Sequence, residues 1–230
     1  MSLTAAFFGT GGLRGRFVHR FWATHQRAPA AAKLLAQVLA ELPQDGRGLN
    51  VGSGETRLDP RLLNLDLARG AAVDCVADAL QLPFPRSGFA LVVSQETVEH
   101  LPDPFAAVHE MSRVLQPGGS LYLQAPFVIG YHPGPEDYWR FTRAGMRRLV
   151  EQAGIRQVQV EPVIGAGTGF HRILVEFTAG LAARVLPAAY APAKGLATLV
   201  FYPLKWLDGW LLGGSQRDRI PGGYVAIGKK

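Results

Sequence analysis

Short apolar runs that end in polar residues alternate along the chain with segments whose apolar residues recur every three or four positions. The runs predict buried parallel strands at 49–51, 63–66, 73–78, 89–94, 120–127 and 155–163. The periodic segments predict helices at 29–42, 104–115 and 143–153, the last with Thr142 as N-cap and Gly154 as stop. This alternation predicts an α/β fold with an open, doubly wound sheet, which binds its ligand beyond the carboxyl ends of the strands.

The C-terminal part of the chain departs from this alternation. Residues 166–213 carry two apolar stripes at helical spacing, and residues 222–230 predict a last, antiparallel strand. We therefore expect a helical insertion, residues 166–219, just before that strand. Charged residues interrupt both stripes, so neither reaches the ~20 apolar residues that a membrane-spanning helix needs.

Length and composition favour one globular domain, because 230 residues with 48% hydrophobic content can bury a large core. We divide the chain into a basic and aromatic N-terminal arm, residues 1–27, and a domain, residues 28–230. The arm is interpreted either as a segment that packs partly on the domain or as an interfacial membrane anchor. The single cysteine, Cys75, excludes an internal disulfide, and Ala5–Phe8 is too short for a secretory signal, so we expect a cytoplasmic protein.

The net charge of +6 is compatible with binding to nucleic acid, with an anionic membrane surface or with ordinary solubility. The basic residues are dispersed, which argues against nucleic acid as a partner. Four aromatic residues of the insertion suit a membrane interface: Phe201, Tyr202, Trp206 and Trp210. Among the three explanations of the charge we weight the membrane surface most. For the helices of the insertion, a cap over a substrate pocket or a dimer face comes first, and peripheral contact with the inner membrane surface is the alternative.

The turn after the first predicted strand contains Gly52 and Gly54, which can take positive φ and let a ligand lie against the backbone. Asp66 closes the next strand, where a carboxylate can accept both hydroxyls of a ribose. Together they predict a nucleoside-bearing cofactor. A nicotinamide dinucleotide fits less well, because Arg57 stands at the third glycine position of G-x-G-x-x-G and Asp66 comes too early.

Three successive strands end in polar residues beside this turn: Asp66, Asp78 and the run Ser94-Gln95-Glu96. Residues of these types also cap helices and form turns, so one of them alone would mean little. Because the carboxyl ends of parallel strands share one edge of a sheet, the three together indicate a single ligand crevice.

These segments resemble those of class I S-adenosylmethionine-dependent methyltransferases, and more narrowly the type 11 methyltransferase domain. The similarity rests on Val51–Gly54, Asn64–Asp66, Ala77–Phe84, Ser94–Pro102 and the turn Arg113–Gly119, and it covers residues 48–165 and the final strand. It implies a mostly parallel, seven-stranded Rossmann-like sheet with S-adenosylmethionine at its edge. The connection from Gly54 to the second strand is too short for a full crossover helix, so we expect a shortened variant.

The resemblance also implies a role for each matching residue. Gly52, Ser53 and Gly54 would line the methionine and ribose of the cofactor, and Asp66 would take the ribose hydroxyls. The adenine would be held by Asp78, Ala79 and Leu80, and the sulfonium and acceptor would be bordered by Ser94, Gln95 and Glu96. Asn50 belongs to the same cofactor site, although it stands where many members carry an acidic residue.

Methyl transfer from a sulfonium is an in-line displacement to which alignment contributes most, and a base is required only if the acceptor must lose a proton. The candidates on the acceptor side are His100 and four residues of the loop after the fifth strand: His132, Asp137, Tyr138 and Arg140. In the alternative interpretation His100 only marks the entry to a helix, and Asp137 and Arg140 form an ion pair that holds the loop. No metal is expected at Glu96 and His100, because no further ligands at metal-ligand spacing accompany them.

The leading hypothesis is a metal-independent methyltransferase that acts on a small molecule or an amphiphile such as a lipid or lipid-linked sugar. A second hypothesis is a nucleic-acid or protein methyltransferase. The fourth strand ends Ser-Gln-Glu-Thr, without the Asn/Asp-Pro-Pro-aromatic signature of amino-directed nucleic-acid enzymes. A third is a non-catalytic cofactor-binding or membrane-interaction protein. The sequence leaves the acceptor atom and the oligomeric state open.

Overall fold

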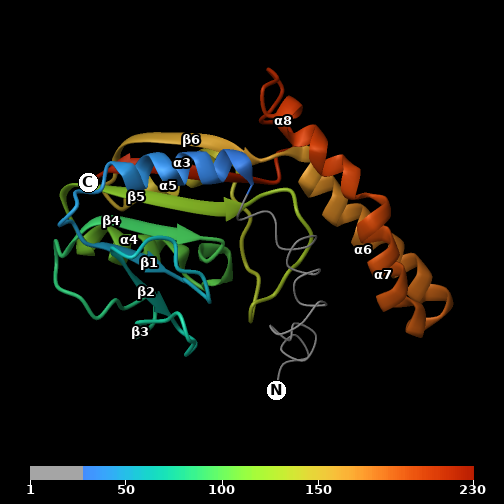
Figure 1. Cartoon of the computed structure of the whole chain (residues 1–230), viewed down its shortest axis with the longest axis horizontal. Coiled ribbons are helices and arrows are strands. Elements are labelled where there is room, and N and C mark those ends of the chain that lie inside the picture. The colour runs from blue at the N-terminus through green and yellow to red at the C-terminus, as the bar shows by residue number, and fades with distance from the viewer. Residues whose placement is uncertain (1–27) are drawn as a thin grey trace.

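The structure is a computed structural model that describes residues 28–230, so the predicted N-terminal arm, residues 1–27, lies outside the described residues. Its centre is a seven-stranded sheet in the order β3-β2-β1-β4-β5-β7-β6 (Figure 1). Only β7 runs antiparallel to its neighbours, β5 and β6. The strands are β1 Gly48–Val51, β2 Leu62–Asp66, β3 Cys75–Val76, β4 Phe89–Gln95, β5 Leu115–Pro126, β6 Arg156–Ile164 and β7 Gly223–Lys229. The predicted fold class is confirmed.

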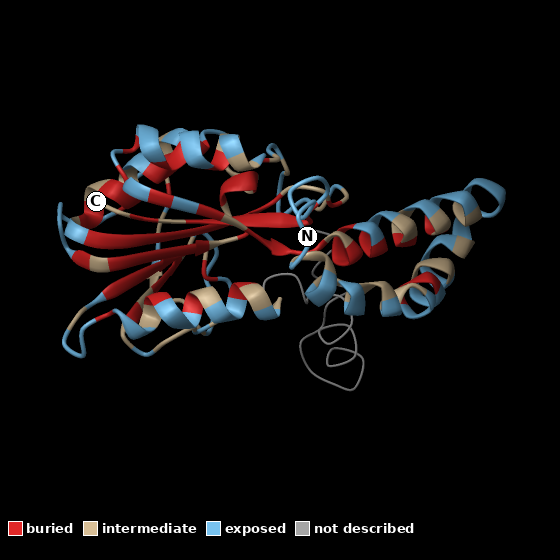
Figure 2. Ribbon diagram, turned by 90° about the horizontal axis from the view of Figure 1, so that it is seen from above, coloured by how far each residue is buried: buried red, intermediate tan, exposed pale blue. Residues whose placement is uncertain are grey.

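Helices cover both faces of the sheet, and Figure 2 shows the buried strands between them. Helix α3 (Pro29–Ala40) packs Ala31, Leu35 and Val38 on one face. Helices α4 (Pro104–Val114) and α5 (Arg143–Gln152) bury their apolar stripes on the opposite face. Neighbouring residues of β4 point to opposite faces, so each face has its own apolar cluster. The predicted helices are confirmed to within two residues at each end.

The predicted ends of α5 are also confirmed. The hydroxyl of Thr142 accepts a hydrogen bond from the backbone N–H of Gly145 at 3.1 Å, as an N-cap does. Gly154 follows the helix with a φ of 83°, a conformation that glycine adopts without the strain a Cβ would add.

The connection between β2 and β3 differs from the prediction, because the strand expected over 73–78 is reduced to two residues. Backbone hydrogen bonds to β2 flank these two residues, from the N–H groups of Asp74 and Ala77 to the carbonyl oxygens of Asn64 and Asp66 at 2.9 and 3.0 Å. A side chain takes the next position: the carboxylate of Asp74 accepts the backbone N–H of Asn64 at 2.8 Å and pairs with Arg57 at 2.7 Å. A side-chain acceptor thus occupies a backbone donor that a longer β3 would have used.

Loops replace the helices that usually connect β1, β2 and β3, and the described residues 52–61 and 67–74 contain no helix. Two buried asparagines tie these loops together. Asn50 donates its amide to Asn64 at 3.1 Å, and Asn64 donates to the carbonyl oxygens of Thr56 and Ala72 at 3.1 and 2.9 Å. The shortened first crossover is therefore confirmed, and its buried polar groups are satisfied by these side chains.

The predicted helical insertion is confirmed between β6 and β7. It contains α6 (Ala166–Val185), α7 (Tyr190–Val200) and α8 (Asp208–Leu211), with 3-10 turns at Pro187–Ala189 and Tyr202–Leu207. Helices α6 and α7 lie side by side and project from the carboxyl edge of the sheet (Figure 1). The carboxylate of Asp208 joins the two ends of the insertion by accepting the backbone N–H and hydroxyl of Thr168. Within residues 28–230, no helix has both the length and the apolar character needed to cross a bilayer.

Candidate functional site

The glycine turn after β1 lies at the carboxyl edge of the sheet. Gly52 and Gly54 have φ values of 70° and 51°, and a Cβ on Gly52 would collide with the side chain of Thr97. Beside Gly54 the space for a Cβ is open, and its backbone N–H donates to a carboxylate oxygen of Asp66 at 2.8 Å. The turn therefore presents bare backbone next to an acidic side chain.

Asp66 and Asp78 both fix the backbone that follows their strands. The second carboxylate oxygen of Asp66 accepts the N–H of Ala68 at 2.9 Å, and Asp78 accepts the N–H of Leu80 at 2.9 Å. A carboxylate has about four acceptor sites, so each keeps capacity for a ligand hydroxyl or amine.

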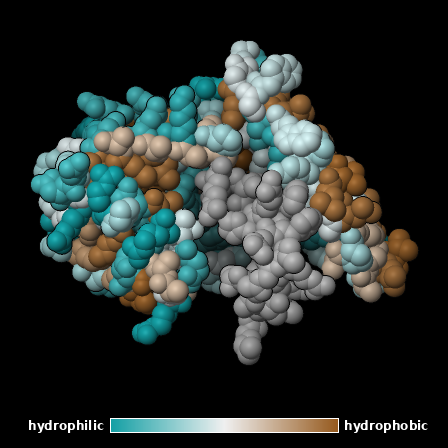
Figure 3. Space-filling model, viewed as in Figure 1, coloured by the Kyte–Doolittle hydropathy of each residue, from teal (hydrophilic) through white to brown (hydrophobic). Residues whose placement is uncertain are grey.

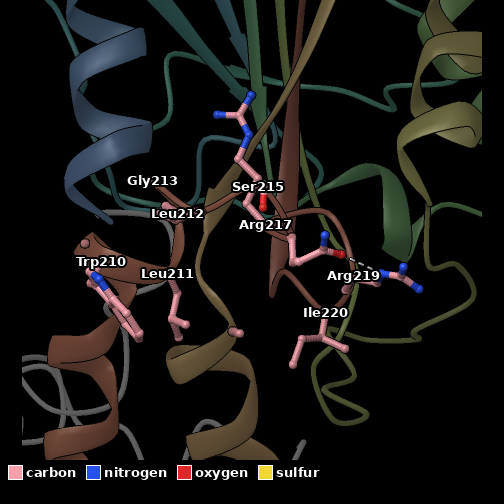
Figure 4. Close-up of a pocket in the computed structure, with 12 residues that line it drawn as sticks. Trp210, Leu211, Leu212, Gly213, Ser215, Arg217, Arg219 and Ile220 are labelled. Carbon is pink, nitrogen blue, oxygen red and sulfur yellow. Dashed lines mark hydrogen bonds between the residues drawn. The ribbon is translucent and has the colours of Figure 1, made fainter.

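A cavity of about 250 Å³ opens between α3 and the glycine turn. Four of the predicted cofactor residues line it: Asn50, Gly52, Ser53 and Gln95. A larger pocket of about 670 Å³ lies between α8 and the loop 212–220, and none of the predicted site residues lines it (Figure 4). Of these two pockets, the smaller therefore fits the sequence prediction.

The end of β4 carries a buried polar network. Gln95 donates its amide to Gln124 on β5 at 2.9 Å, and Gln124 donates to the carboxylate of Glu96 at 3.3 Å. Ser94 is fully buried, and among residues 28–230 its hydroxyl has no hydrogen-bond partner. Sequence reasoning missed Gln124, although a glutamine inside an apolar strand was a usable signal.

Glu96 adopts a strained backbone conformation. Its φ is 52°, a left-handed value that costs of order 1–3 kcal/mol for a residue with a Cβ. Its backbone N–H donates to the carbonyl oxygen of Gln124 at 3.0 Å, which holds the turn. This conformation turns the chain sharply out of the sheet, and the short helix η1 (Val98–His100) follows.

The loop 130–141 docks on η1 through its main chain. The carbonyl oxygen of Glu99 accepts the N–H groups of Tyr138 and Trp139 at 2.8 and 3.3 Å. The indole of Trp139 donates to the carbonyl oxygen of Leu101 at 3.0 Å, and Phe141 is buried beneath it. These contacts place the acceptor-side candidates next to His100.

Asp137 and Arg140 form the ion pair that the alternative interpretation predicted. The Asp137 side chain is 1% exposed and receives both guanidinium nitrogens of Arg140, at 2.5 and 2.6 Å. Burial alone would raise the pKa of Asp137, but hydrogen bonds from Arg140 and from the N–H of His132 outweigh it and lower the pKa to about 2. Arg140 also donates to the carbonyl oxygen of Gly130 at 3.1 Å, so the pair holds the loop.

Glu99 joins the two histidines on the acceptor side. Its carboxylate is fully buried, and one oxygen lies 3.6 Å from Nε2 of His100 and 3.6 Å from Nε2 of His132. Burial raises the pKa of Glu99 well above its usual range, and the charge of Glu96 adds to the rise. Burial lowers the pKa of His132, with a further contribution from the Arg172 guanidinium.

The structure thus brings the predicted residues into two groups at one edge. The cofactor candidates surround the glycine turn and the ends of β2, β3 and β4, although the Asn50 amide is engaged by Asn64. The acceptor candidates His100, His132, Asp137 and Arg140 meet around η1, while the Tyr138 side chain is 53% exposed. Their individual roles stay predictions. Glu99 and the buried Arg172 of α6 were not predicted as site residues. The negative charge of Glu96 favours the charged form of the Arg172 guanidinium.

Residues 49–123, which contain the glycine turn and the ends of β2, β3 and β4, match the family model described as "Methyltransferase domain". These residues are a class I, S-adenosylmethionine-dependent methyltransferase domain. The strand order and the antiparallel β7 extend the same fold to the end of the chain.

Two curated relatives and one solved structure illustrate the similarity. The chain is 33% identical over 94 residues to 27-O-demethylrifamycin SV methyltransferase of Amycolatopsis mediterranei, covering 37% of this chain and 34% of the relative. It is 24% identical over 148 residues to ubiquinone biosynthesis O-methyltransferase of Idiomarina loihiensis, covering 57% and 60%. The chain thus spans less than two thirds of both relatives. The fold is similar to that of a SAM-dependent methyltransferase from Archaeoglobus fulgidus, with a TM-score of 0.58, 14% identity and coverage of 95% and 100%.

The residues present fit S-adenosylmethionine. The glycine turn offers backbone that no Cβ shields, and the open space beside Gly54 is next to the Asp66 carboxylate. Asp66 would provide acceptors for the ribose hydroxyls, and the turn held by Asp78 presents Ala79 and Leu80, which would hold the adenine. The buried hydroxyl of Ser94 adds an unused polar atom at the end of β4.

Proposed function

We propose that this chain transfers the methyl group of S-adenosylmethionine to a small-molecule acceptor. The observation that carries this proposal is the hydrogen bond from the Gly54 N–H to Asp66, because it joins a bare backbone turn to a ribose acceptor. It lies within the residues that match the methyltransferase family, and the relatives named above support a small acceptor.

S-adenosylmethionine supplies an electrophilic methyl on a positively charged sulfur. A lone pair of the acceptor forms the new bond to carbon while the carbon–sulfur electrons return to sulfur, which leaves a neutral thioether. The chain contributes mainly alignment, by fixing the adenosine at Asp66 and the acceptor at η1. An acceptor hydroxyl would also need a base, and His100 and His132 are the titratable side chains beside Glu99 that could take its proton.

Transfer of labelled methyl from S-adenosylmethionine into a fractionated extract tests this function. We expect the label in the small-molecule fraction, lipid or aqueous, when the purified chain is added. Label in the nucleic-acid or protein fraction would support the second hypothesis instead. Cofactor binding without label in any fraction would support a non-catalytic protein and contradict the proposed reaction.

We further infer that the acceptor is amphiphilic and reaches the site at a membrane surface. The side chains that support this project from the insertion: Phe177, Leu181, Val185, Leu196 and Val200 are each more than half exposed. Trp206 and Trp210 are 73% and 79% exposed. Figure 3 shows apolar side chains gathered over this part of the molecule. Exposed aromatic and apolar residues on an amphipathic helix suit the boundary between lipid headgroups and acyl chains.

Sedimentation with anionic vesicles of phosphatidylglycerol and phosphatidylcholine tests this inference. The wild-type chain is expected to pellet at low salt, and the double variant Trp206→Ser, Trp210→Ser to bind about tenfold less, because interfacial binding scales with buried apolar area. Val76→Ser removes an exposed apolar side chain from the far edge strand β3 and is the matched control. A wild-type chain that stays in the supernatant at low salt contradicts the inference.

A further inference from the structure

Glu99, His100 and His132 bring three metal-ligating atoms together beside the loop 130–141. Each histidine Nε2 lies 3.6 Å from the same Glu99 oxygen, and all three atoms lie within 4.8 Å of one another. In a tetrahedral zinc site, bond lengths of 2.0–2.1 Å put neighbouring ligand atoms about 3.3 Å apart. The two distances to Glu99 are therefore close to those of a metal site without its ion, and the two histidine atoms lie within 4.8 Å of each other.

The environment of the Glu99 carboxylate is a second indication that a cation binds here. It is fully buried, and within the described part of the chain neither of its oxygens has a hydrogen-bond partner. A buried carboxylate is unfavourable unless it is paired, protonated or bound to a metal. The carboxylate of Glu96 adds a second negative charge in the same region. A cation at this position would compensate both.

Hydrogen bonds orient both imidazole rings for coordination. Nδ1 of His100 lies 2.6 Å from the carbonyl oxygen of Glu136, which can only accept, so Nδ1 carries the proton and Nε2 the lone pair. Nδ1 of His132 lies 3.2 Å from the carbonyl oxygen of Gly130. Nη2 of Arg140 also lies 3.2 Å from this Nδ1, but its two N–H groups donate to Gly130 and Asp137, so we assign the same tautomer. Metal-bound histidines are typically held by a second-shell carbonyl in this way.

We propose that Glu99, His100 and His132 bind one divalent transition-metal cation of the zinc type. Two imidazoles and one carboxylate suit such an ion, and three protein ligands leave a position for water or a substrate oxygen. The His100 and His132 side chains are 16% and 19% exposed, which gives the ion access from solvent. No metal was predicted from the sequence, because Glu96 and His100 have no further ligands close to them along the chain. His132 comes from a distant loop.

The two histidines of this site are also the candidate bases for methyl transfer, so the test reads out metal binding directly and not turnover. The full chain is stripped with a chelator and titrated with Zn²⁺ by calorimetry. We expect one ion per chain. Glu99→Gln and His132→Ala should each weaken binding by more than the roughly 10- to 100-fold that loss of a second-shell partner costs. His109→Ala removes an exposed histidine of α4 and should bind like the wild type.

Cobalt provides the second readout. Co²⁺ bound by Glu99 and both histidines should show the intense visible absorption of four- or five-coordinate cobalt, and His100→Ala should lose it. Circular dichroism identifies the variants that fold, and any one of the three ligand variants that does so is sufficient. A wild-type chain without a stoichiometric site, a folded ligand variant that binds normally, or equal loss in His109→Ala would overturn the proposal.

Discussion

Replacing Arg140 with alanine is expected to lower the free energy of unfolding by about 3–5 kcal/mol, because it leaves a buried carboxylate without its partner. The Asp137 side chain is 1% exposed and depends on both guanidinium nitrogens, and Arg140 also holds Gly130. The part of the loop that carries His132 would lose its anchor, because Asp137 accepts the His132 N–H. We therefore expect methyl transfer to be abolished while affinity for S-adenosylhomocysteine survives, since the glycine turn directly follows β1 and is separate from this loop.

Chemical denaturation, calorimetric binding and turnover check this prediction together. Arg147→Ala is the matched control, because it breaks an exposed pair with Glu151 on α5 and should cost less than about 1 kcal/mol. Arg140→Lys keeps the charge but not the two-pronged contact, so an intermediate stability is expected. Loss of cofactor affinity together with activity would show that the pair supports the whole domain and is not specific to the acceptor side.

Replacing Asp66 with alanine should weaken binding of S-adenosylhomocysteine by about 10- to 100-fold. Hydrogen bonds to a charged group contribute roughly 1.5–3 kcal/mol, and the change also removes the acceptor of the Gly54 N–H. Isothermal titration measures the effect. Asp45→Ala removes an exposed carboxylate from the loop before β1 and is expected to bind normally. If Asp66→Ala binds within twofold of the wild type, Asp66 does not hold the ribose.

The sequence was sufficient for the features that depend on neighbours along the chain. Apolar runs predicted most of the strands, Thr142 and Gly154 predicted the ends of α5, and Gly52 and Gly54 predicted a turn with positive φ after β1. Each of these features follows from local geometry: residue periodicity, a capping hydroxyl, or a φ that disfavours a Cβ. The family resemblance added the mostly parallel, seven-stranded sheet, whose strand order comes from the structure.

Features that depend on residues far apart in sequence were not predictable in the same way. At the reduced β3, the Asp74 carboxylate accepts the backbone N–H of Asn64, a contact that no local pattern reveals. Gln124 and Arg172 reach the end of β4 from β5 and α6, so only the folded arrangement brings them together. The triad of Glu99, His100 and His132 likewise exists only because the loop 130–141 folds back on η1.

A crystal structure of the full chain with S-adenosylhomocysteine is the most direct test of the central claim. We predict that the adenosine lies across Gly52–Gly54, with both ribose hydroxyls on Asp66, the adenine beside Ala79 and Leu80, and the sulfur directed toward Glu96. A compound bound elsewhere, or a glycine turn that stays empty at saturating concentration, would contradict the assignment of this edge as a methyl-transfer site.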